Sequence, residues 1–167
     1  MGATPRAPGH PFAENIMKSY DTVADLKPLV GEHIGTSDWL LIDQERINKF
    51  ADATGDHQWI HVDPERAASG PFGVPIAHGF LTLSLLSNFF LSAFEIRKST
   101  MGVNYGLNKV RFMKPVPVNS RLRAHFKLLS WDALEGEGAQ MLIEMSVEQE
   151  GATKPVCVAE SITRRFP

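Results

Sequence analysis

Alternation of apolar and polar residues dominates the second half of the chain. Four segments show it, with glycine or proline near each junction: "VNYGLNKVRFMKPV" (103–116), "SRLRAHFKLLSW" (120–131), "AQMLIEMSVEQEG" (139–151) and "PVCVAESITRRF" (155–166). A period of two is typical of β-strands, whose successive side chains point to opposite faces of a sheet. Because short turns join these strands, we expect successive strands to pair as antiparallel neighbours.

The segment before these strands has a different pattern. "GFLTLSLLSNFFLSAF" (79–94) is apolar on nearly every side, which predicts one helix about 24 Å long that is surrounded by protein. It is too short and too rich in Ser, Thr and Asn to span a membrane. One long helix followed by antiparallel strands predicts an α+β fold in which the sheet wraps around a central helix, the hot dog arrangement.

The first part of the chain predicts three smaller elements. A short helix over residues 22–30 is followed by a strand over residues 33–42. A second helix follows Asp43, a good N-cap, with apolar positions on one face between residues 47 and 54. Gly55 stands where a left-handed residue would end that helix.

Residues 56–77 form an unusually long connection with several prolines and glycines, so they are expected to be irregular apart from one helical turn at 65–69. Connections of this length inside a domain are commonly functional. Asp56 and His61 lie close together on it. A carboxylate and an imidazole can hold a water molecule between them and exchange its protons near neutral pH. Alternatively, Asp56 caps a turn and His61 is a half-buried polar residue.

The start of the central helix offers a second chemical feature. "PIAHGF" (75–80) supplies no Ser, Thr, Asp or Asn directly before Gly79 to cap the first backbone N–H groups. These donors and the helix dipole could bind a ligand carbonyl and stabilise an oxyanion, and Gly79 has no Cβ to hinder the approach. Alternatively, His78 or an ordered water caps the helix.

Other polar clusters suggest further possibilities. A metal could be held by ligands among His57, His61, Asp63 and His78, but a loop lacks the helical register that aims two histidines at one ion. The cluster Lys109, Arg111 and Lys114 could meet the phosphates of a ligand or be solvated charge on a strand. No serine-hydrolase elbow or nucleotide-binding glycine loop occurs.

Composition narrows the class of protein. The chain has 167 residues, 43% hydrophobic and 22% charged, as in soluble globular proteins. The net charge of −2 and the lack of a basic stripe argue against nucleic acid as a partner. A single cysteine, Cys157, and no secretory signal pattern favour the cytoplasm, and no membrane association is expected. We expect residues 1–12 to be a disordered tail and residues 13–167 to be a single domain.

A longer motif points to a known family. "FADATGDHQWIHVDPERAASGPFGVPIAHGF" (50–80) resembles the hydratase motif of the MaoC-like (R)-specific enoyl-CoA hydratases, in which an aromatic residue and Ala precede SGDxNPIHxD and a later IAHG. The segments "NYGLNKVRF" (104–112) and "VAES" (158–161) are also similar to members of its probable enoyl-CoA hydratase branch. The resemblance covers nearly the whole chain from about Tyr20 onward.

The resemblance implies a hot dog fold that dimerises and an Asp–His pair that holds the water added to a trans-2-enoyl thioester. Asp56 and His61 match that pair, Gly79 matches the glycine whose amide binds the thioester carbonyl, and Ser87 matches a serine that anchors the site. Gln58 and Trp59 replace the common Asn–Pro, and Thr54 replaces its Ser. Gln58 keeps an amide beside the pair, and the bulkier Trp59 could alter the preferred acyl chain length.

We therefore predict an (R)-specific enoyl-CoA hydratase that needs no cofactor and no metal, acts on an acyl-CoA or acyl carrier protein thioester, and forms a homodimer. Its predicted catalytic residues are Asp56, His61 and Gly79, and its predicted substrate-binding residues are Gln58, Trp59, His78, Ser87, Lys109 and Arg111. An acyl-CoA thioesterase and a non-catalytic acyl-CoA binding module are the alternatives.

Overall fold

A computed structural model describes residues 17–167, so the tail predicted for residues 1–12 lies outside the described residues. The first half of the chain contains β1 (Lys18–Tyr20), the 3₁₀ helix η1 (Val23–Leu29), β2 (His33–Thr36), β3 (Leu40–Ile42), α1 (Gln44–Thr54), α2 (Trp59–Val62) and α3 (Pro64–Ala68). The second half contains α4 (Gly79–Ser84), α5 (Leu86–Ala93), β4 (Phe94–Ile96), β5 (Met101–Phe112), β6 (Ser120–Ala133), β7 (Ala139–Gln149) and β8 (Cys157–Phe166).

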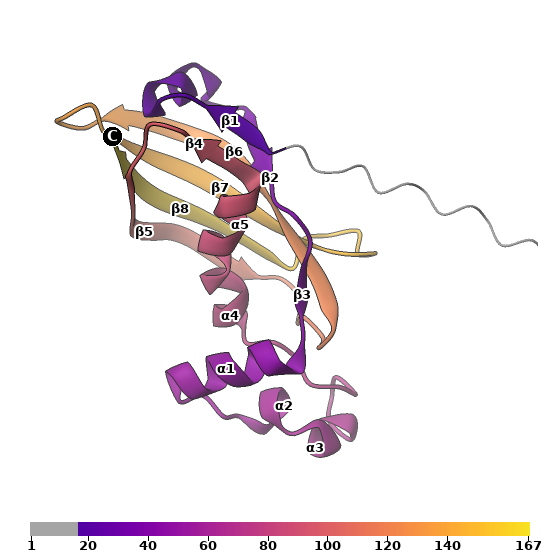
Figure 1. The fold of residues 1–167 in the computed structure, drawn as a ribbon. Coiled ribbons are helices and arrows are strands. Elements are labelled where there is room, and N and C mark those ends of the chain that lie inside the picture. Colours follow the sequence, from indigo (N-terminus) through magenta and orange to yellow (C-terminus); the bar gives the residue numbers. More distant parts are fainter. Residues whose placement is uncertain (1–16) are drawn as a thin grey trace, which may run out of the picture.

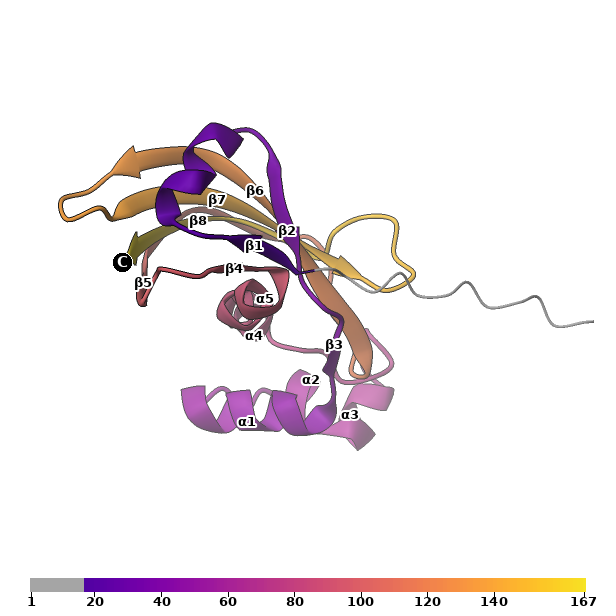
Figure 2. The ribbon, with the colours of Figure 1, turned by 45° about the horizontal axis from the view of Figure 1, so that its top comes forward.

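The main sheet is antiparallel, and α4 and α5 lie against its concave face (Figures 1 and 2). Its strand order is β2-β6-β7-β8-β5, and β3 also pairs with β6. The helices α1, α2 and α3 lie together beyond the lower end of the sheet in Figure 1. The predicted hot dog arrangement is confirmed. A small parallel sheet of β1 and β4 was not predicted, because strands of three residues are too short to show a period.

The expectation that successive strands are neighbours is wrong for β5 and β6. The strand β5 pairs with β8 at one edge of the sheet, and the chain then crosses to begin β6. The crossing segment pairs instead with residues 75–77, through Ala77 N–H to the Val116 carbonyl (2.8 Å) and Val118 N–H to the Pro75 carbonyl (2.8 Å). These bonds fix the segment that leads into α4.

The predicted central helix is interrupted at Leu85, and its last predicted residue, Phe94, begins β4. The Ser84 hydroxyl donates to the Phe80 carbonyl (2.7 Å), a side-chain bond of the kind that bends helices. The expectation that protein surrounds the helix is also wrong for the single chain, because Phe80 is 68% and Leu91 79% exposed. The sheet of one chain covers one side of the helix.

Aromatic rings fasten α5 to the sheet. The rings of Phe90 and Phe126 stack with centroids 4.4 Å apart, and Phe94 meets both rings edge-on. The strand β2 can approach the end of α5 because Gly35 has no side chain, since a Cβ there would lie 2.7 Å from the Ala93 carbonyl oxygen. This packing holds α4 and α5 in a fixed direction along the sheet.

The helix α1 confirms the predicted caps. Asp43 accepts a hydrogen bond from Arg46 N–H (2.8 Å), and Gly55 ends the helix with a left-handed φ of 75°. The single strand expected over residues 33–42 is divided into β2 and β3. Between them the buried Ser37 keeps the contact with β6 by bonding to both the N–H and the carbonyl of Ala124.

The N-cap of α1 is testable by unfolding in urea. Asp43→Ala should lower the free energy of unfolding by about 1 kcal/mol, because it leaves an N–H of the first turn without its partner. Glu45→Ala, which removes only an exposed pair with Lys49, is the matched control and should cost less than about 0.5 kcal/mol. Equal losses in the two variants, at one fixed protein concentration, would contradict the capping role.

Candidate active site

Asp56, His61 and His78 come together at the start of α4. One ligand atom of each side chain lies within 4.8 Å of the others. Asp56 follows the turn at Gly55, His61 lies in α2, and His78 directly precedes α4. The structure thus brings the predicted Asp56–His61 pair together and adds His78, which the sequence had suggested as a substrate-binding residue, a metal ligand or a helix cap.

The His61 ring is held in one orientation. It is 6% exposed, and its Nδ1 lies 2.6 Å from the Ile76 carbonyl oxygen, which can only accept, so Nδ1 carries the proton. The neutral ring therefore presents Nε2 as an acceptor. Gln44 Nε2 donates to the His61 carbonyl (2.7 Å) and Ile76 N–H to the Ile60 carbonyl (3.0 Å), so the backbone on both sides of this bond is fixed as well.

His78 supports both members of the pair. Its ring stacks on that of His61 with centroids 3.7 Å apart, and Phe50 covers it at 5.0 Å. His78 Nε2–H donates to the Asp56 backbone carbonyl (2.9 Å), which holds the loop of Asp56 against the histidines. The Nδ1 atom of His78 is buried and has no hydrogen-bond partner among residues 17–167.

Electrostatics favour a neutral His61 beside an accessible carboxylate. Burial lowers the pKa of His61, and the proximity of His78 lowers it further, while the Ile76 carbonyl and Asp56 oppose this. The Asp56 side chain is 54% exposed. One of its oxygens accepts from Gln58 N–H (3.3 Å), and the other lies 3.9 Å from His78 Nε2. A water between Asp56 and His61 Nε2 could therefore donate to both.

The N-terminus of α4 lies beside this cluster. No side chain caps it, so the alternative in which His78 caps the helix is wrong. The ring of Phe112 lies over Gly79, where a Cβ would come within 3.1 Å of it, so a larger residue here would have to push that ring aside. Phe112 also meets the exposed Phe80 ring at 5.8 Å, so two aromatic rings lie at the N-terminus of α4.

Trp59 and Gln58, two of the predicted substrate-binding residues, lie at the start of α2. Trp59 packs on Gly70, where a Cβ would lie 2.8 Å from its ring, and the Arg66 guanidinium covers it at 4.6 Å. Gln58 is exposed at the N-cap of α2. Trp59 therefore stabilises the connection between α3 and the following loop.

The other three predicted binding residues lie away from the cluster. Ser87 stands eight residues beyond Gly79 and accepts a hydrogen bond from Asn104 Nδ2 (3.4 Å). Lys109 forms an ion pair with Glu160 (2.8 Å), and Arg111 donates to the carbonyl of its neighbour Val110 (2.8 Å). Their proposed contacts with substrate stay predictions.

Two of the four metal ligands suggested by the sequence are engaged elsewhere in the structure. His57 pairs with Asp52 (2.8 Å), and Asp63 caps α3 by accepting from Arg66 N–H (3.0 Å). Asp56, His61 and His78 still offer three ligand atoms. In this arrangement one nitrogen of each ring is already engaged, since His61 Nδ1–H donates to the Ile76 carbonyl and His78 Nε2–H donates to the Asp56 carbonyl.

Comparisons with known proteins identify the family of this chain. A family model described as the MaoC-like domain matches residues 25–161. The 3-hydroxyacyl-thioester dehydratase Z of Mycobacterium tuberculosis is 54% identical over 148 residues, which cover 89% of this chain and 98% of that protein. Nodulation protein N of Rhizobium leguminosarum bv. viciae is 50% identical over 147 residues, which cover 85% of this chain and 89% of that protein.

The fold is also found among solved structures. R-hydratase PhaJ1 from Pseudomonas aeruginosa, in its unliganded form, superposes with a TM-score of 0.65 at 24% sequence identity, covering 82% of this chain and 81% of that chain. At this level of identity the likeness concerns the fold.

The environment of His61 is testable by following its imidazole resonances with pH by NMR. Its pKa should lie below the ordinary value of 6.5, so the ring stays neutral as the pH falls through that value. His57 is an internal control, because the hydrogen bond to Asp52 raises its pKa. In His78→Gln the pKa of His61 should rise, since the variant loses both burial and the neighbouring ring. A His61 midpoint at or above 6.5 in the unmodified protein would contradict this description.

Proposed function

The chain belongs to the MaoC-like family of dehydratases and is a hydro-lyase, and we propose that it catalyses the reversible syn hydration of a trans-2-enoyl-CoA to an (R)-3-hydroxyacyl-CoA. The family resemblance noted in the sequence is confirmed. The observation that carries the proposal is the placement of Asp56 and His61 beside the uncapped N-terminus of α4. The 54% identity to a 3-hydroxyacyl-thioester dehydratase supports a thioester substrate.

The proposed reaction uses a water held by Asp56 and His61. The water oxygen bonds to C3 of the enoyl group while the pair accepts one of its protons, and a proton is delivered to C2. The Gly79 N–H stabilises the thioester oxygen, which gains negative charge as the bond at C3 forms. Dehydration is the same sequence in reverse. Because Asp56 and His61 are coupled, the proton transfers are assigned to the pair.

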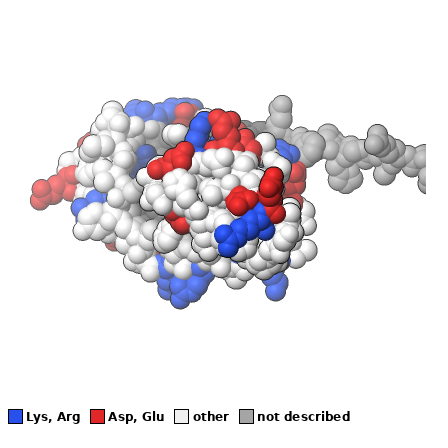
Figure 3. All heavy atoms as spheres, turned by 90° about the horizontal axis from the view of Figure 1, so that it is seen from below, with Lys and Arg blue, Asp and Glu red and all other residues white. Residues whose placement is uncertain are grey.

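These steps require no metal and no redox cofactor. The surface seen from below, on the side of α1, α2 and α3, has small mixed groups of charged residues and large uncharged areas (Figure 3). On this face the charges of both signs are interspersed, and no basic stripe of the kind that nucleic acid requires is seen. None of the helices in residues 17–167 is long and apolar enough to cross a membrane. A cytoplasmic location stays a prediction.

The exposed strand β5 supports the proposed homodimer. Only Val110 of its twelve residues is even partly buried, and β5 pairs with the sheet through β8 alone. Met101, Val103 and Tyr105 are 51%, 41% and 56% exposed. An edge strand this long and apolar is a template for pairing with another strand, and a second copy would also cover the open side of α4 and α5.

Hydration is testable with two conservative variants. Asp56→Asn and His61→Gln should each lower turnover roughly 10²- to 10⁴-fold, because each removes a group that exchanges protons with the water. The measurement is the loss of ultraviolet absorbance of the conjugated enoyl-CoA. The matched controls Asp52→Asn and His57→Gln alter a nearby exposed pair and should retain activity. Full activity in either site variant would remove that residue from the mechanism.

The same assay separates the alternative functions. A thioesterase would release free CoA, which a colorimetric thiol reagent detects, and a binding module would bind acyl-CoA without changing it. The proposal predicts loss of the double bond without thiol release, and chiral analysis should give the (R)-product.

The dimer is testable by light scattering after gel filtration. The unmodified protein should have twice the chain mass of 18.5 kDa, and Val103→Lys should favour the monomer because a charge on an edge strand blocks pairing. Val30→Lys, at another exposed apolar position, is the control and should stay dimeric. A monomeric unmodified protein, or dimeric Val103→Lys, would contradict pairing through β5.

A further inference from the structure

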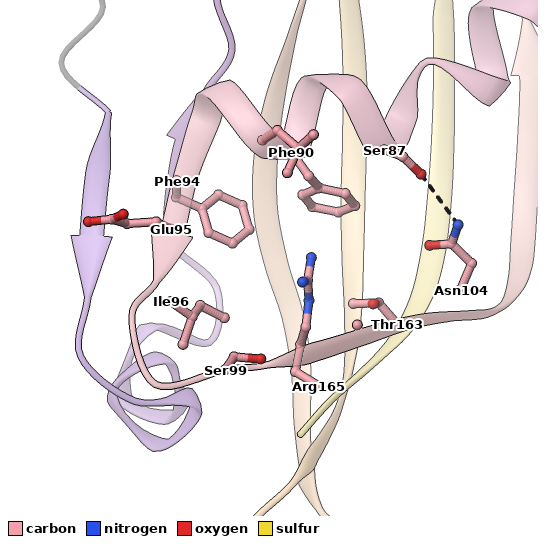
Figure 4. A pocket seen from close by; sticks show the side chains of 11 residues that line it. Ser87, Phe90, Phe94, Glu95, Ile96, Ser99, Asn104, Thr163 and Arg165 are labelled. Carbon is pink, nitrogen blue, oxygen red and sulfur yellow. Dashed lines mark hydrogen bonds between the residues drawn. The ribbon is translucent and has the colours of Figure 1, made fainter. Parts of the chain in front are cut away.

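A cavity of about 350 Å³ lies between α5 and the strands β5 and β8 (Figure 4). Phe90, Phe94 and Ile96 form its apolar wall. Its polar lining residues are Ser87, Glu95, Ser99, Asn104, Thr163 and Arg165. The volume is within the range of small-molecule sites, and the mixture of an apolar wall with a few polar groups is typical of them.

Arg165 differs from the other residues that line the cavity, because it brings a positive charge into it. Its guanidinium points into the cavity toward the Phe90 ring, 5.9 Å from the centroid. Within residues 17–167 its side chain has no ion pair or hydrogen bond. Glu95 lines the same cavity but points away from Arg165 (Figure 4), and it bonds to Ser19 (2.7 Å) and lies 3.5 Å from Arg97. Among the described residues of one chain, the cation in this cavity therefore has no anion of its own.

Arg165 is half-buried. Partial removal from water lowers the pKa of its guanidinium, because burial disfavours the charged form. Arginine nevertheless stays protonated in proteins, so a half-buried guanidinium beside apolar rings can be stabilised by an anion that enters the cavity.

The strand β5 makes room for this guanidinium. Gly102 pairs with Arg165 across the sheet, and a Cβ at position 102 would overlap Arg165 Nη1. The neighbouring Arg164 on the opposite face has partners, since it lies over the Tyr105 ring at 3.5 Å and donates to Gln140 (3.0 Å). The two adjacent arginines therefore differ in what they contact.

Contacts between the helices and β5 connect this cavity with the catalytic end. Phe112 lies over Gly79, and a second cavity of about 300 Å³ follows, lined by Leu83, Ser84 and Leu107. The two cavities adjoin at the Ser87–Asn104 hydrogen bond, because both residues line both cavities. From Gly79 to Ser87 the helix rise is about 12 Å. An acyl chain that ran from Gly79 along α4 and α5 would therefore enter the Arg165 cavity beyond Ser87.

We propose that this cavity binds the far end of the acyl chain and that Arg165 recognises a carboxylate there, so that medium-chain trans-2-enoyl thioesters with a terminal carboxylate are preferred substrates. The proposal rests on the proposed hydratase function. A planar guanidinium matches a carboxylate with two parallel hydrogen bonds, and the Ser87 hydroxyl and Asn104 amide are further donors close by. The phosphates of CoA lie at the other end of the substrate and do not compete for this site.

The test compares two substrates of equal length, trans-2-decenoyl-CoA and the CoA ester of trans-2-decenedioic acid with its free carboxylate at the far end. The unmodified protein should show a kcat/KM about tenfold or more higher for the carboxylate substrate, as one charge-assisted pair implies. Arg165→Met should lose this preference and retain activity on the uncharged substrate.

Two further variants separate charge recognition from folding. Arg164→Met removes a charge at the next position and should keep the preference. Gly102→Ala removes no charge but displaces the guanidinium, so it should lower the preference as Arg165→Met does. Equal kcat/KM values for the two substrates in the unmodified protein would overturn the proposal. So would equal losses on both substrates in both Arg165→Met and Gly102→Ala.

Failure of the hydratase function would be visible separately, as hydration of neither substrate by the unmodified protein. The anion site is then tested by calorimetry with decanedioate. Binding by the unmodified protein and Arg164→Met, but not by Arg165→Met, would support the site. Absence of binding to the unmodified protein would overturn it.

Discussion

The hydrogen bond from His61 Nδ1 to the Ile76 carbonyl is the interaction on which the site depends. It connects α2 with the segment that enters α4, and because a carbonyl can only accept, it fixes which nitrogen of the ring is free. Hydrogen bonds of Gln44 to His61 and of Ala77 to Val116 hold the two backbones that this bond joins. A ring that turned freely would present either nitrogen to the water and would give a poorer base.

His78 shows how one buried side chain can support two reactive ones. It bonds to the backbone at Asp56 and stacks on His61, so the carboxylate and the imidazole keep a common position although they come from different segments.

The second constraint is the direction of α4 and α5 along the sheet. The contact of Phe90 with Phe126 and the close approach of Gly35 to Ala93 hold the helices against the strands. The N-terminus of α4 then lies at the catalytic cluster, and the cavity with Arg165 lies at the other end. The helices α4 and α5 thus extend from the catalytic cluster, where the substrate would react, to the Arg165 cavity, where its tail would lie. The exposed strand β5 runs beside the two helices.

The sequence by itself determined the local features, because each depends on residues close together in the chain. Alternation identified the four long strands, Asp43 and Gly55 marked the ends of α1, and the motif from Asp56 to Gly79 marked the site. Short-range patterns cannot state which strands become neighbours, so the pairing of β5 with β8 was not foreseen. The sequence pattern also could not show that one side of the central helix is open in the single chain. A helix that is apolar all round has the same pattern whether one chain or two chains cover it.

Only the tertiary structure decided the contacts between distant segments. The stacking of His78 on His61, the packing of Trp59 on Gly70, and the unpaired Arg165 in its cavity each depend on where backbones meet in space. Arg164 and Arg165 are alike in sequence, but the alternation of a strand places them on opposite faces. One face offers Tyr105 and Gln140 as partners, and the other directs the charge into the cavity beside Phe90.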